Sequence, residues 1–170
     1  APTQISWLAY CNTLGFDNID YLIADHNLIN KKEEKFYSEK IIKLPEIWNA
    51  HSGFDIKRNL IKSPFNKNNF LTFGSFGNFK KISDEVVDSW SSILKKINGS
   101  KLILKSSINF DTENLMKKFK KCGIDDQIKI YNRLDFNDIS SHLDLYNEVD
   151  IALDTFPYNG VTTTFEALWK

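Results

Sequence analysis

The sequence predicts an α/β fold in which a parallel sheet is flanked by helices. Between Phe70 and Trp169, short apolar runs alternate four times with stretches whose apolar residues recur at helical spacing. The chain is 42% apolar and 14% aromatic, so its composition supports a buried core and argues against disorder. Ligands of such sheets bind at the carboxyl ends of the strands, which makes the loops 74–81 and 155–161 the candidate binding loops.

The first part of the chain has short apolar runs separated by polar connections. We expect strands over Gln4–Tyr10, Tyr21–Ala24 and Ile41–Leu44, and a short charged helix over Lys31–Tyr37. Residues 45–67 contain prolines, a glycine and several asparagines with little periodicity, which is typical of a connector. We place a domain boundary near the end of that stretch.

The second part alternates strands and helices. We expect strands over 70–73, 101–104, 128–131 and 151–153, and helices that begin at Ser83, at Asp111 or Thr112, and at Asp138. The last strand is a short apolar run between aspartates, a pattern typical of a strand covered on both faces. A final helix is expected to begin within Thr162–Thr164.

The loop after the last strand can hold a phosphate. Pro157 and Asn159-Gly160 mark a tight loop, and the threonines that follow offer hydroxyls and free N–H groups at a helix start. Simple capping of the helix explains the same threonines. Asp154 could orient the loop or a ligand, or cap a turn.

Other candidate residues also have a plain structural explanation. Gly74 and Gly77 do not match the dinucleotide fingerprint, but Lys80 and Lys81 could neutralise phosphate oxygens, or simply be exposed lysines. His142 could contact a ligand or only pack on its helix. Glu166 could accept hydrogen bonds from sugar hydroxyls or complement a helix dipole.

Charge and cysteine content exclude several classes of function. The 22 basic and 22 acidic residues give a net charge of zero, so we expect no general nucleic-acid binding. No apolar run approaches the roughly 20 residues of a membrane span, and no His/Cys cluster has metal-ligand spacing. Cys11 and Cys122 are expected to be buried thiols in a reducing compartment, which predicts a cytoplasmic protein without membrane association.

Two long motifs carry a resemblance to a known family. Phe73–Ile82 (FGSFGNFKKI) and Leu153–Trp169 (LDTFPYNGVTTTFEALW) closely resemble the protein O-linked N-acetylglucosamine transferases, family 41 of the glycosyltransferases. Tyr37–Ile41 with Leu44-Pro45, and Trp7–Tyr10, are also similar to that family, so the resemblance spans essentially the whole chain. The chain departs from the family at Cys11-Asn12, where Pro-Gly is usual, and at Gly77, where Asn is common.

The resemblance implies a GT-B glycosyltransferase fragment with Rossmann-like lobes. Residues 1–25 would end the first catalytic lobe, 26–67 would connect the lobes, and 68–170 would form a truncated second lobe that binds a UDP-sugar. The implied donor is UDP-N-acetylglucosamine, transferred with inversion to Ser or Thr of protein acceptors. No metal or other cofactor is expected, because lysine and helix-terminus amides would take the place of a cation. The family's helical repeats, of the tetratricopeptide type, would lie outside this chain.

The resemblance also implies roles for individual residues. Lys81 would be catalytic, contacting the donor diphosphate and stabilising its charge as UDP leaves. The residues implied to bind the donor are Asn78, His142, Thr162, Thr163 and Glu166, with Glu166 on the ribose hydroxyls. The chain opens without Met and ends about two turns into a helix, so we expect a piece of a larger protein that is inactive by itself.

Two other interpretations remain open at this point. A non-catalytic nucleotide-sugar-binding or scaffolding relative would share the donor-site residues and lack a usable histidine in its first lobe. A flavodoxin-like receiver or cofactor domain fits less well, because the chain lacks the acidic pocket or glycine-rich turn of that class.

Overall fold

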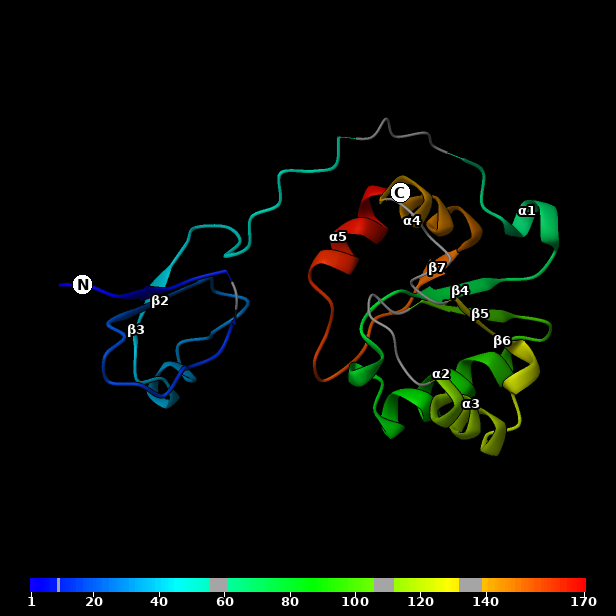
Figure 1. Ribbon diagram of the computed structural model, residues 1–170, viewed down its shortest axis with the longest axis horizontal. Helices are drawn as coiled ribbons and strands as arrows, with labels where there is room; N and C mark the ends of the chain where they lie inside the picture. The colour runs from blue at the N-terminus through cyan, green and yellow to red at the C-terminus, as the bar shows by residue number, and fades with distance from the viewer. Residues whose placement is uncertain (9, 56–60, 106–111, 132–138) are drawn as a thin grey trace. The chain divides into compact units, whose positions relative to one another are not determined.

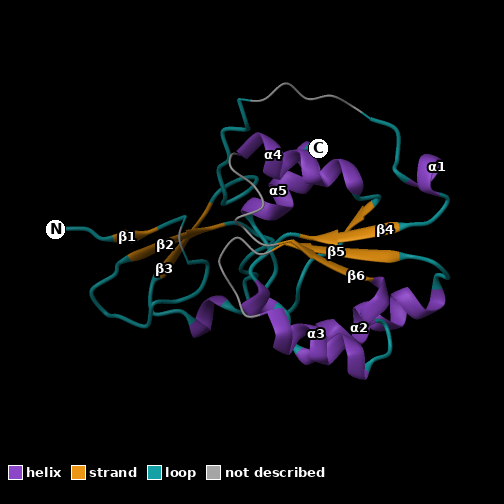
Figure 2. Ribbon diagram, turned by 45° about the vertical axis from the view of Figure 1, so that its right-hand side comes forward, coloured by secondary structure: helices purple, strands orange, loops and turns teal. Residues whose placement is uncertain are grey.

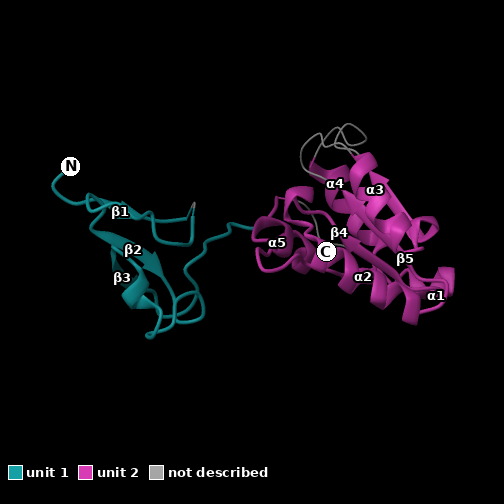
Figure 3. Ribbon diagram, turned by 90° about the horizontal axis from the view of Figure 1, so that it is seen from below, with its two compact units in different colours: residues 1–53 teal, residues 54–170 magenta. Residues whose placement is uncertain are grey.

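The computed structural model describes residues 1–8, 10–55, 61–105, 112–131 and 139–170 (Figure 1). Contacts divide the chain into two compact units, residues 1–53 and residues 54–170 (Figure 3). Each unit is described by itself below. The assignment of residues 1–25, 26–67 and 68–170 to two lobes and a connector stays a prediction.

The first unit contains a three-stranded parallel sheet in the order β1-β2-β3. Its strands are β1 (Ile5–Ser6), β2 (Tyr21–Ala24) and β3 (Lys40–Lys43), and the register pairs Tyr21 with Lys40. All three expected strands are present, although the first is shorter than the sequence predicts. The charged stretch 31–37 forms only one turn of 3₁₀ helix, η1 (Glu34–Phe36). Leu22, Ala24 and Ile29 make the small buried core of this unit.

Asp25 is a buried carboxylate that organises the chain after β2. Its Oδ1 accepts hydrogen bonds from the amides of Asn27 (2.8 Å) and Leu28 (2.7 Å), and its Oδ2 accepts one from the amide of Trp48 (2.8 Å). Burial raises the pKa of this carboxyl, but the three N–H donors outweigh burial and hold the pKa of Asp25 below its ordinary value of 3.8. Asp25 therefore ties residues 27–28 and 48 to the end of the sheet.

Glu39 plays a similar part before β3. The hydroxyl of Thr13 and the amide of Leu14 each donate a hydrogen bond of 2.7 Å to its carboxylate. Burial again raises the pKa, and the hydrogen bonds again outweigh it, so that the pKa of Glu39 lies below its ordinary value of 4.5. The loop at residues 13–14 is thereby fixed against the start of β3.

The second unit is a three-layer α/β structure, which confirms the predicted parallel sheet. Its four strands all run parallel in the order β6-β5-β4-β7. The strands are β4 (Thr72–Ser75), β5 (Lys101–Lys105), β6 (Ile128–Tyr131) and β7 (Ile151–Ala152). Figure 2 shows α2 and α3 on one side of the sheet and α4 and α5 on the other.

The described helices of this unit are α1 (Phe65–Asn68), η2 (Phe79–Lys81), α2 (Asp84–Lys96), α3 (Thr112–Lys121), η3 (Asp125–Gln127), α4 (Ile139–Asp144), η5 (Leu145–Glu148) and α5 (Thr162–Trp169). The expected helices occur in the predicted order, and three short helices, α1, η2 and η3, were not predicted. The single helix expected from Asp138 to Val149 is an α-helix followed by a 3₁₀ helix. Its first residue, like the expected cap Asp111, lies outside the described residues.

The apolar face of α2 forms the main core, as its periodicity predicts. Val86, Val87, Trp90 and Leu94 are buried together with sheet residues such as Phe73 and Leu102. The Ser83 hydroxyl caps the helix by accepting a hydrogen bond from the Val86 amide (3.3 Å). Capping and burial together fix α2 against β4 and β5.

Gly74 permits the pairing of β7 with β4. An added Cβ at Gly74 would lie 2.5 Å from Cγ2 of Val149, so only glycine leaves room for this close approach. The Asp150 amide then donates to Thr72 O (2.8 Å) and the Leu153 amide to Gly74 O (2.7 Å). The order of the strands reverses here, because β5 and β6 lie on one side of β4 and β7 on the other.

Two expectations about burial are wrong. The strand 151–153 was expected to be covered on both faces, but Ile151 is 44% exposed because β7 is the edge strand of the described sheet. Cys11 and Cys122 are free thiols that are partly exposed rather than buried. The sequence pattern around a short apolar run or a single cysteine therefore does not predict how deeply these residues are buried.

Replacement of Asp25 by Asn should destabilise the first unit. The lowered pKa means that ionised Asp25 contributes stability above its ordinary value of 3.8, and that this contribution is lost as pH falls through the lower folded pKa. At neutral pH we expect a loss of roughly 1–3 kcal/mol in local opening free energy. Hydrogen exchange of the amides in residues 21–48 measures this loss.

Asp17→Asn, at an exposed position in the same unit, is the matched control. The Asp25 variant should also show a weaker acid dependence of exchange below about pH 4 than the parent chain. Unchanged protection of residues 21–48 in Asp25→Asn would contradict the role assigned to this carboxylate.

Candidate functional site

The loops that follow β4 and β7 meet at the carboxyl ends of these neighbouring strands. Lys81, at the end of η2, donates a hydrogen bond from Nζ to Asn159 O (2.9 Å). The same Nζ lies 4.4 Å from the centroid of the Tyr158 ring. The two predicted binding loops are therefore in direct contact, at the point where the strand order reverses.

Asp154 determines the shape of the loop after β7. Its Oδ1 accepts hydrogen bonds from the amides of Thr155 and Gly160, both at 2.8 Å. Its Oδ2 accepts one from the hydroxyl of Thr164 (3.1 Å), in the first turn of α5. These hydrogen bonds show that Asp154 orients the loop after β7, which is one of the functions expected for it.

Gly160 fits where a larger residue does not. An added Cβ would lie 2.6 Å from Thr163 Oγ1, 2.9 Å from Thr164 Oγ1 and 3.2 Å from Asp154 Oδ1. The backbone of the loop thus packs directly against the beginning of α5. This close approach explains the glycine without any need for a positive φ angle.

The threonines do begin a helix, as predicted, but they do not cap it. α5 starts at Thr162, its N-cap residue is Val161, and no side chain makes a capping hydrogen bond. The simple capping explanation is therefore not realised. The first-turn amides and the positive end of the helix dipole remain available to an anion.

Asn78 shapes the turn that carries the lysines. Its side-chain Oδ1 accepts a hydrogen bond from the Lys80 amide (3.0 Å), and its carbonyl accepts one from the Lys81 amide (2.9 Å). Lys80 is exposed and Lys81 is half-buried, so the two neighbouring lysines differ in their surroundings. Direct contact of Asn78 with a donor stays a prediction.

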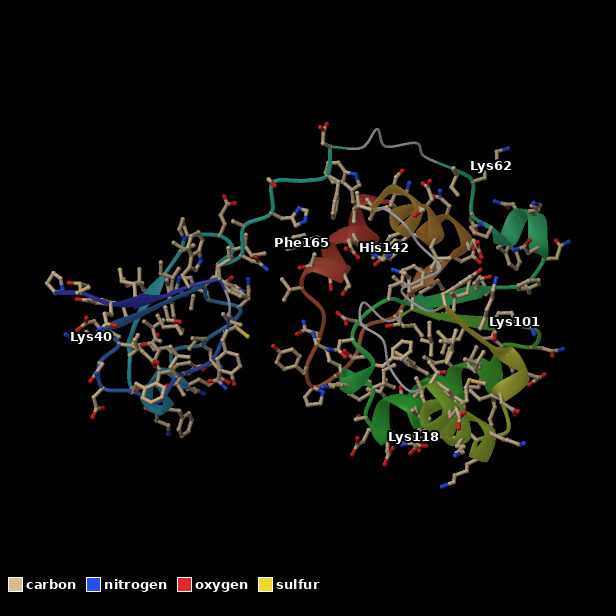
Figure 4. The ribbon with its side chains drawn as sticks, viewed as in Figure 1. Lys40, Lys62, Lys101, Lys118, His142 and Phe165 are labelled. Atoms are coloured by element: carbon tan, nitrogen blue, oxygen red, sulfur yellow. The ribbon has the colours of Figure 1, made fainter. Side chains whose placement is uncertain are left out.

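A buried polar cluster lies beside the loops. His142 Nε2 is 3.0 Å from Glu166 Oε2, and the Tyr146 hydroxyl donates to the same oxygen at 3.1 Å. Lys105 Nζ is 2.8 Å from His142 Nδ1. In Figure 4 the label of His142 lies beside α4 and α5, which supply the histidine and the glutamate. We call Lys105, His142, Tyr146 and Glu166 the polar cluster.

The sequence identified two members of the polar cluster and missed the other two. His142 and Glu166 were candidates, whereas Lys105 and Tyr146 were not considered. Lys105 does leave a signal, because it ends the otherwise apolar run Leu102–Leu104 of a buried strand. Glu166 is only 6% exposed, so it faces the cluster and does not serve as a solvated partner of the helix dipole.

The Tyr146 hydroxyl stays a hydrogen-bond donor. Burial first, and then the charge of Glu166, raise the pKa of Tyr146 far above its ordinary value of 10.0. The ring packs against Phe76, with 4.4 Å between centroids, and against His142 at 5.9 Å. The hydroxyl lies 3.1 Å from Glu166 Oε2 and 3.2 Å from Thr163 O, so its one hydrogen is shared between these two acceptors.

The described residues lack two further features. There, no group of three or more His, Cys, Asp and Glu side chains could hold a metal ion. Over the same described residues, no helix is both long and apolar enough to cross a membrane.

Known proteins resemble the chain over nearly its whole length. Two relatives named as a probable UDP-N-acetylglucosamine–peptide N-acetylglucosaminyltransferase SPINDLY, from Hordeum vulgare and Oryza sativa subsp. japonica, are 32% and 33% identical over 99% of the chain. A relative named SEC, from Arabidopsis thaliana, is 27% identical over 99% of the chain. The chain spans only 18% of the length of each of these relatives. No family model matches it.

A solved structure agrees with these relatives. A lysine-to-methionine variant of the O-GlcNAc transferase from Thermobaculum terrenum matches 99% of the chain with a TM-score of 0.88 and 29% identity. The chain covers 32% of that protein. The predicted fold class, a fragment of a GT-B glycosyltransferase, is thereby confirmed.

Gly160→Ala should destabilise the second unit. The added methyl group forces apart Asp154 and the first turn of α5, and overpacking of this kind costs about 1–3 kcal/mol in the free energy of unfolding. Chemical denaturation followed by far-ultraviolet circular dichroism measures the change.

Gly77→Ala is the matched control, because an added Cβ at Gly77 meets nothing within 4 Å. It should leave the unfolding free energy within roughly 0.5 kcal/mol of the parent value. Equal effects of the two substitutions would show that the close approach at Gly160 is not what requires glycine there.

Proposed function

The chain is a relative of the protein O-linked N-acetylglucosamine transferases, as its sequence predicts, and from this premise we propose that its second unit binds a UDP-sugar. The proposed donor is UDP-N-acetylglucosamine. In the full-length protein the sugar would pass to a Ser or Thr hydroxyl of a protein acceptor, with inversion at the anomeric carbon.

The contact between Lys81 and the loop before α5 carries this proposal. It gathers a lysine ammonium and the uncapped amino end of a helix at the reversal of strand order, and both attract anions. A diphosphate seated there would accept hydrogen bonds from Lys81 and from the amides or hydroxyls of Thr162 and Thr163. Asn78 would hold the turn that carries Lys81 and would line the diphosphate site.

In this proposal the polar cluster binds the nucleoside half of the donor. Glu166 is a buried carboxylate, and charged acceptors of this kind make strong hydrogen bonds with hydroxyl groups. We assign the ribose hydroxyls to Glu166, with His142 beside it. Nucleoside and diphosphate would then lie along the first two turns of α5, since Thr162 and Glu166 are one turn apart.

In the proposed reaction, catalysis depends on stabilising the negative charge of the leaving diphosphate. Negative charge grows on the diphosphate as the bond to the sugar breaks, so a fixed ammonium at that position stabilises the transition state more than the ground state. The Lys81 side chain is already held by Asn159 and Tyr158, so it needs little reorganisation. The proposal requires no metal ion and no further cofactor.

The remaining expectations are part of this proposal. The partners would be the donor and a protein or peptide acceptor, without nucleic acid or membrane, in the cytoplasm. Acceptor choice would depend on parts of the full-length protein outside this chain, because the chain spans only 18% of the relatives it matches.

Lys81→Met in the full-length protein should lower kcat more than donor affinity. Loss of one fixed donor to a developing charge costs about 10²–10³ in kcat. The measurement is turnover of a panel of UDP- and GDP-sugars, with calorimetric binding of UDP as the second readout.

Lys80→Met is the internal control, since Lys80 is the neighbouring residue and is exposed. It should keep both turnover and affinity. Activity lost in Lys80→Met but kept in Lys81→Met would reverse the assignment within this turn. Tight UDP binding without turnover in the parent protein would instead support the non-catalytic relative.

A further inference from the structure

Lys105 is a buried cation at the carboxyl end of β5, and it belongs to none of the sequence motifs. The residue is only 5% exposed. Its Nζ lies 2.8 Å from Nδ1 of His142, which is 37 residues further along the chain. A buried lysine needs polar partners to remain charged, and His142 is one of them.

The contact fixes which nitrogen of His142 carries the proton. A lysine ammonium has hydrogens to donate and no lone pair to accept with, so Nδ1 must be the acceptor. A neutral imidazole with an unprotonated Nδ1 carries its hydrogen on Nε2. That nitrogen faces Glu166 Oε2 at 3.0 Å, and it therefore donates a hydrogen bond to the carboxylate.

Two donors converge on one oxygen of Glu166. Nε2 of His142 and the hydroxyl of Tyr146 both bond to Oε2, and these are the hydrogen bonds that the described residues make to this carboxylate. The carboxylate plane is thereby set, and no described residue donates a hydrogen bond to Oε1, which can accept from a ligand. Phe76 keeps the ring of His142 in place, with 6.3 Å between the two centroids.

The charges of the polar cluster agree with donation from Lys105 to His142 and from His142 to Glu166. Lys105 and Glu166 carry opposite charges at the two ends, and a neutral imidazole lies between them. Removal of the ammonium would leave Nδ1 without its cationic partner and would allow the other tautomer. His142 would then present a bare Nε2 to the Glu166 carboxylate, and two acceptors would face each other.

We propose that Lys105 is a positioning residue, which fixes His142 as the Nε2–H tautomer and so aims the Glu166 carboxylate at a vicinal diol of the ligand. The identity of that diol as the ribose of the donor rests on the proposed function. A carboxylate held in this way distinguishes ribose from 2′-deoxyribose, because the second hydrogen bond is lost with the 2′-hydroxyl.

The tautomer can be observed directly by nuclear magnetic resonance. The chain contains three histidines, so long-range ¹H–¹⁵N correlation spectra of the ¹⁵N-labelled chain are simple, and His142→Gln assigns the signals. The expected parent spectrum shows the Nε2–H form of His142. The Lys105→Met variant should lack the signal of the Nε2–H form. The Lys105→Arg variant, which keeps a cationic donor, should show that signal.

Lys101→Met is the matched control, because Lys101 begins the same strand and its Nζ bonds to the carbonyl of Asp126 at 3.2 Å. It should leave the His142 spectrum unchanged. An Nδ1–H form of His142 in the parent chain would overturn the proposal without any variant. The proposal can therefore be tested even if Lys105→Met does not fold.

Calorimetric binding of UDP and 2′-deoxy-UDP provides the functional readout. The parent chain should prefer UDP by about tenfold or more, as expected for one hydrogen bond to a charged group. Lys105→Met should bring the two affinities close together by weakening UDP, whereas a merely structural defect would weaken both nucleotides alike. An undiminished preference in Lys105→Met overturns the proposal.

The two readouts separate this inference from the proposed function. A parent chain that binds neither nucleotide refutes the nucleotide site and the ribose assignment, while the spectrum still decides whether Lys105 sets the tautomer. Nucleotide binding together with an unchanged His142 spectrum in Lys105→Met refutes the role of Lys105 alone.

Discussion

The close approach of Val149 to Gly74 is the constraint on which the second unit depends. Without a side chain at Gly74, β7 can pair with β4 over the short register Phe73–Ile151 and Gly74–Ala152. Parallel strands side by side bring their carboxyl ends to the same edge, so the loops after them must meet. The contact between Lys81 and Asn159 is a consequence of this pairing.

Four hydrogen-bonded carboxylates, Asp25, Asp150, Asp154 and Glu166, divide into two kinds by their partners. Asp25 and Asp150 accept hydrogen bonds largely from backbone amides, and Asp154 accepts from two amides and a threonine hydroxyl, so these three fix the course of the chain. The hydrogen bonds to Glu166 come from the side chains of His142 and Tyr146. A carboxylate oriented by side chains can be tuned by substitution without change to the backbone, which is typical of a binding residue rather than a structural one.

The sequence predicted the succession of strands and helices along the chain and the start of α5, because these follow from local apolar spacing and from turn residues. It also indicated that the loops 74–81 and 155–161 lie at the same edge of the sheet, since both follow parallel strands. It could not place Lys105 against His142, because no local pattern records a contact between residues 37 positions apart. The exposure of Ile151 was missed for a related reason: an apolar run does not show whether its strand lies at the centre or the edge of a sheet.

The resting contacts of Lys81 hold its ammonium ready for an anion. The carbonyl of Asn159 accepts one of the three ammonium hydrogens, so an anion can accept another without displacing that carbonyl. The side chain is also ordered before the ligand arrives, and the rotamer entropy of about 2 kcal/mol that a free lysine would lose on binding is already lost on folding. Binding of an anion at this loop therefore has a smaller entropic cost than binding to a lysine that is free before the ligand arrives.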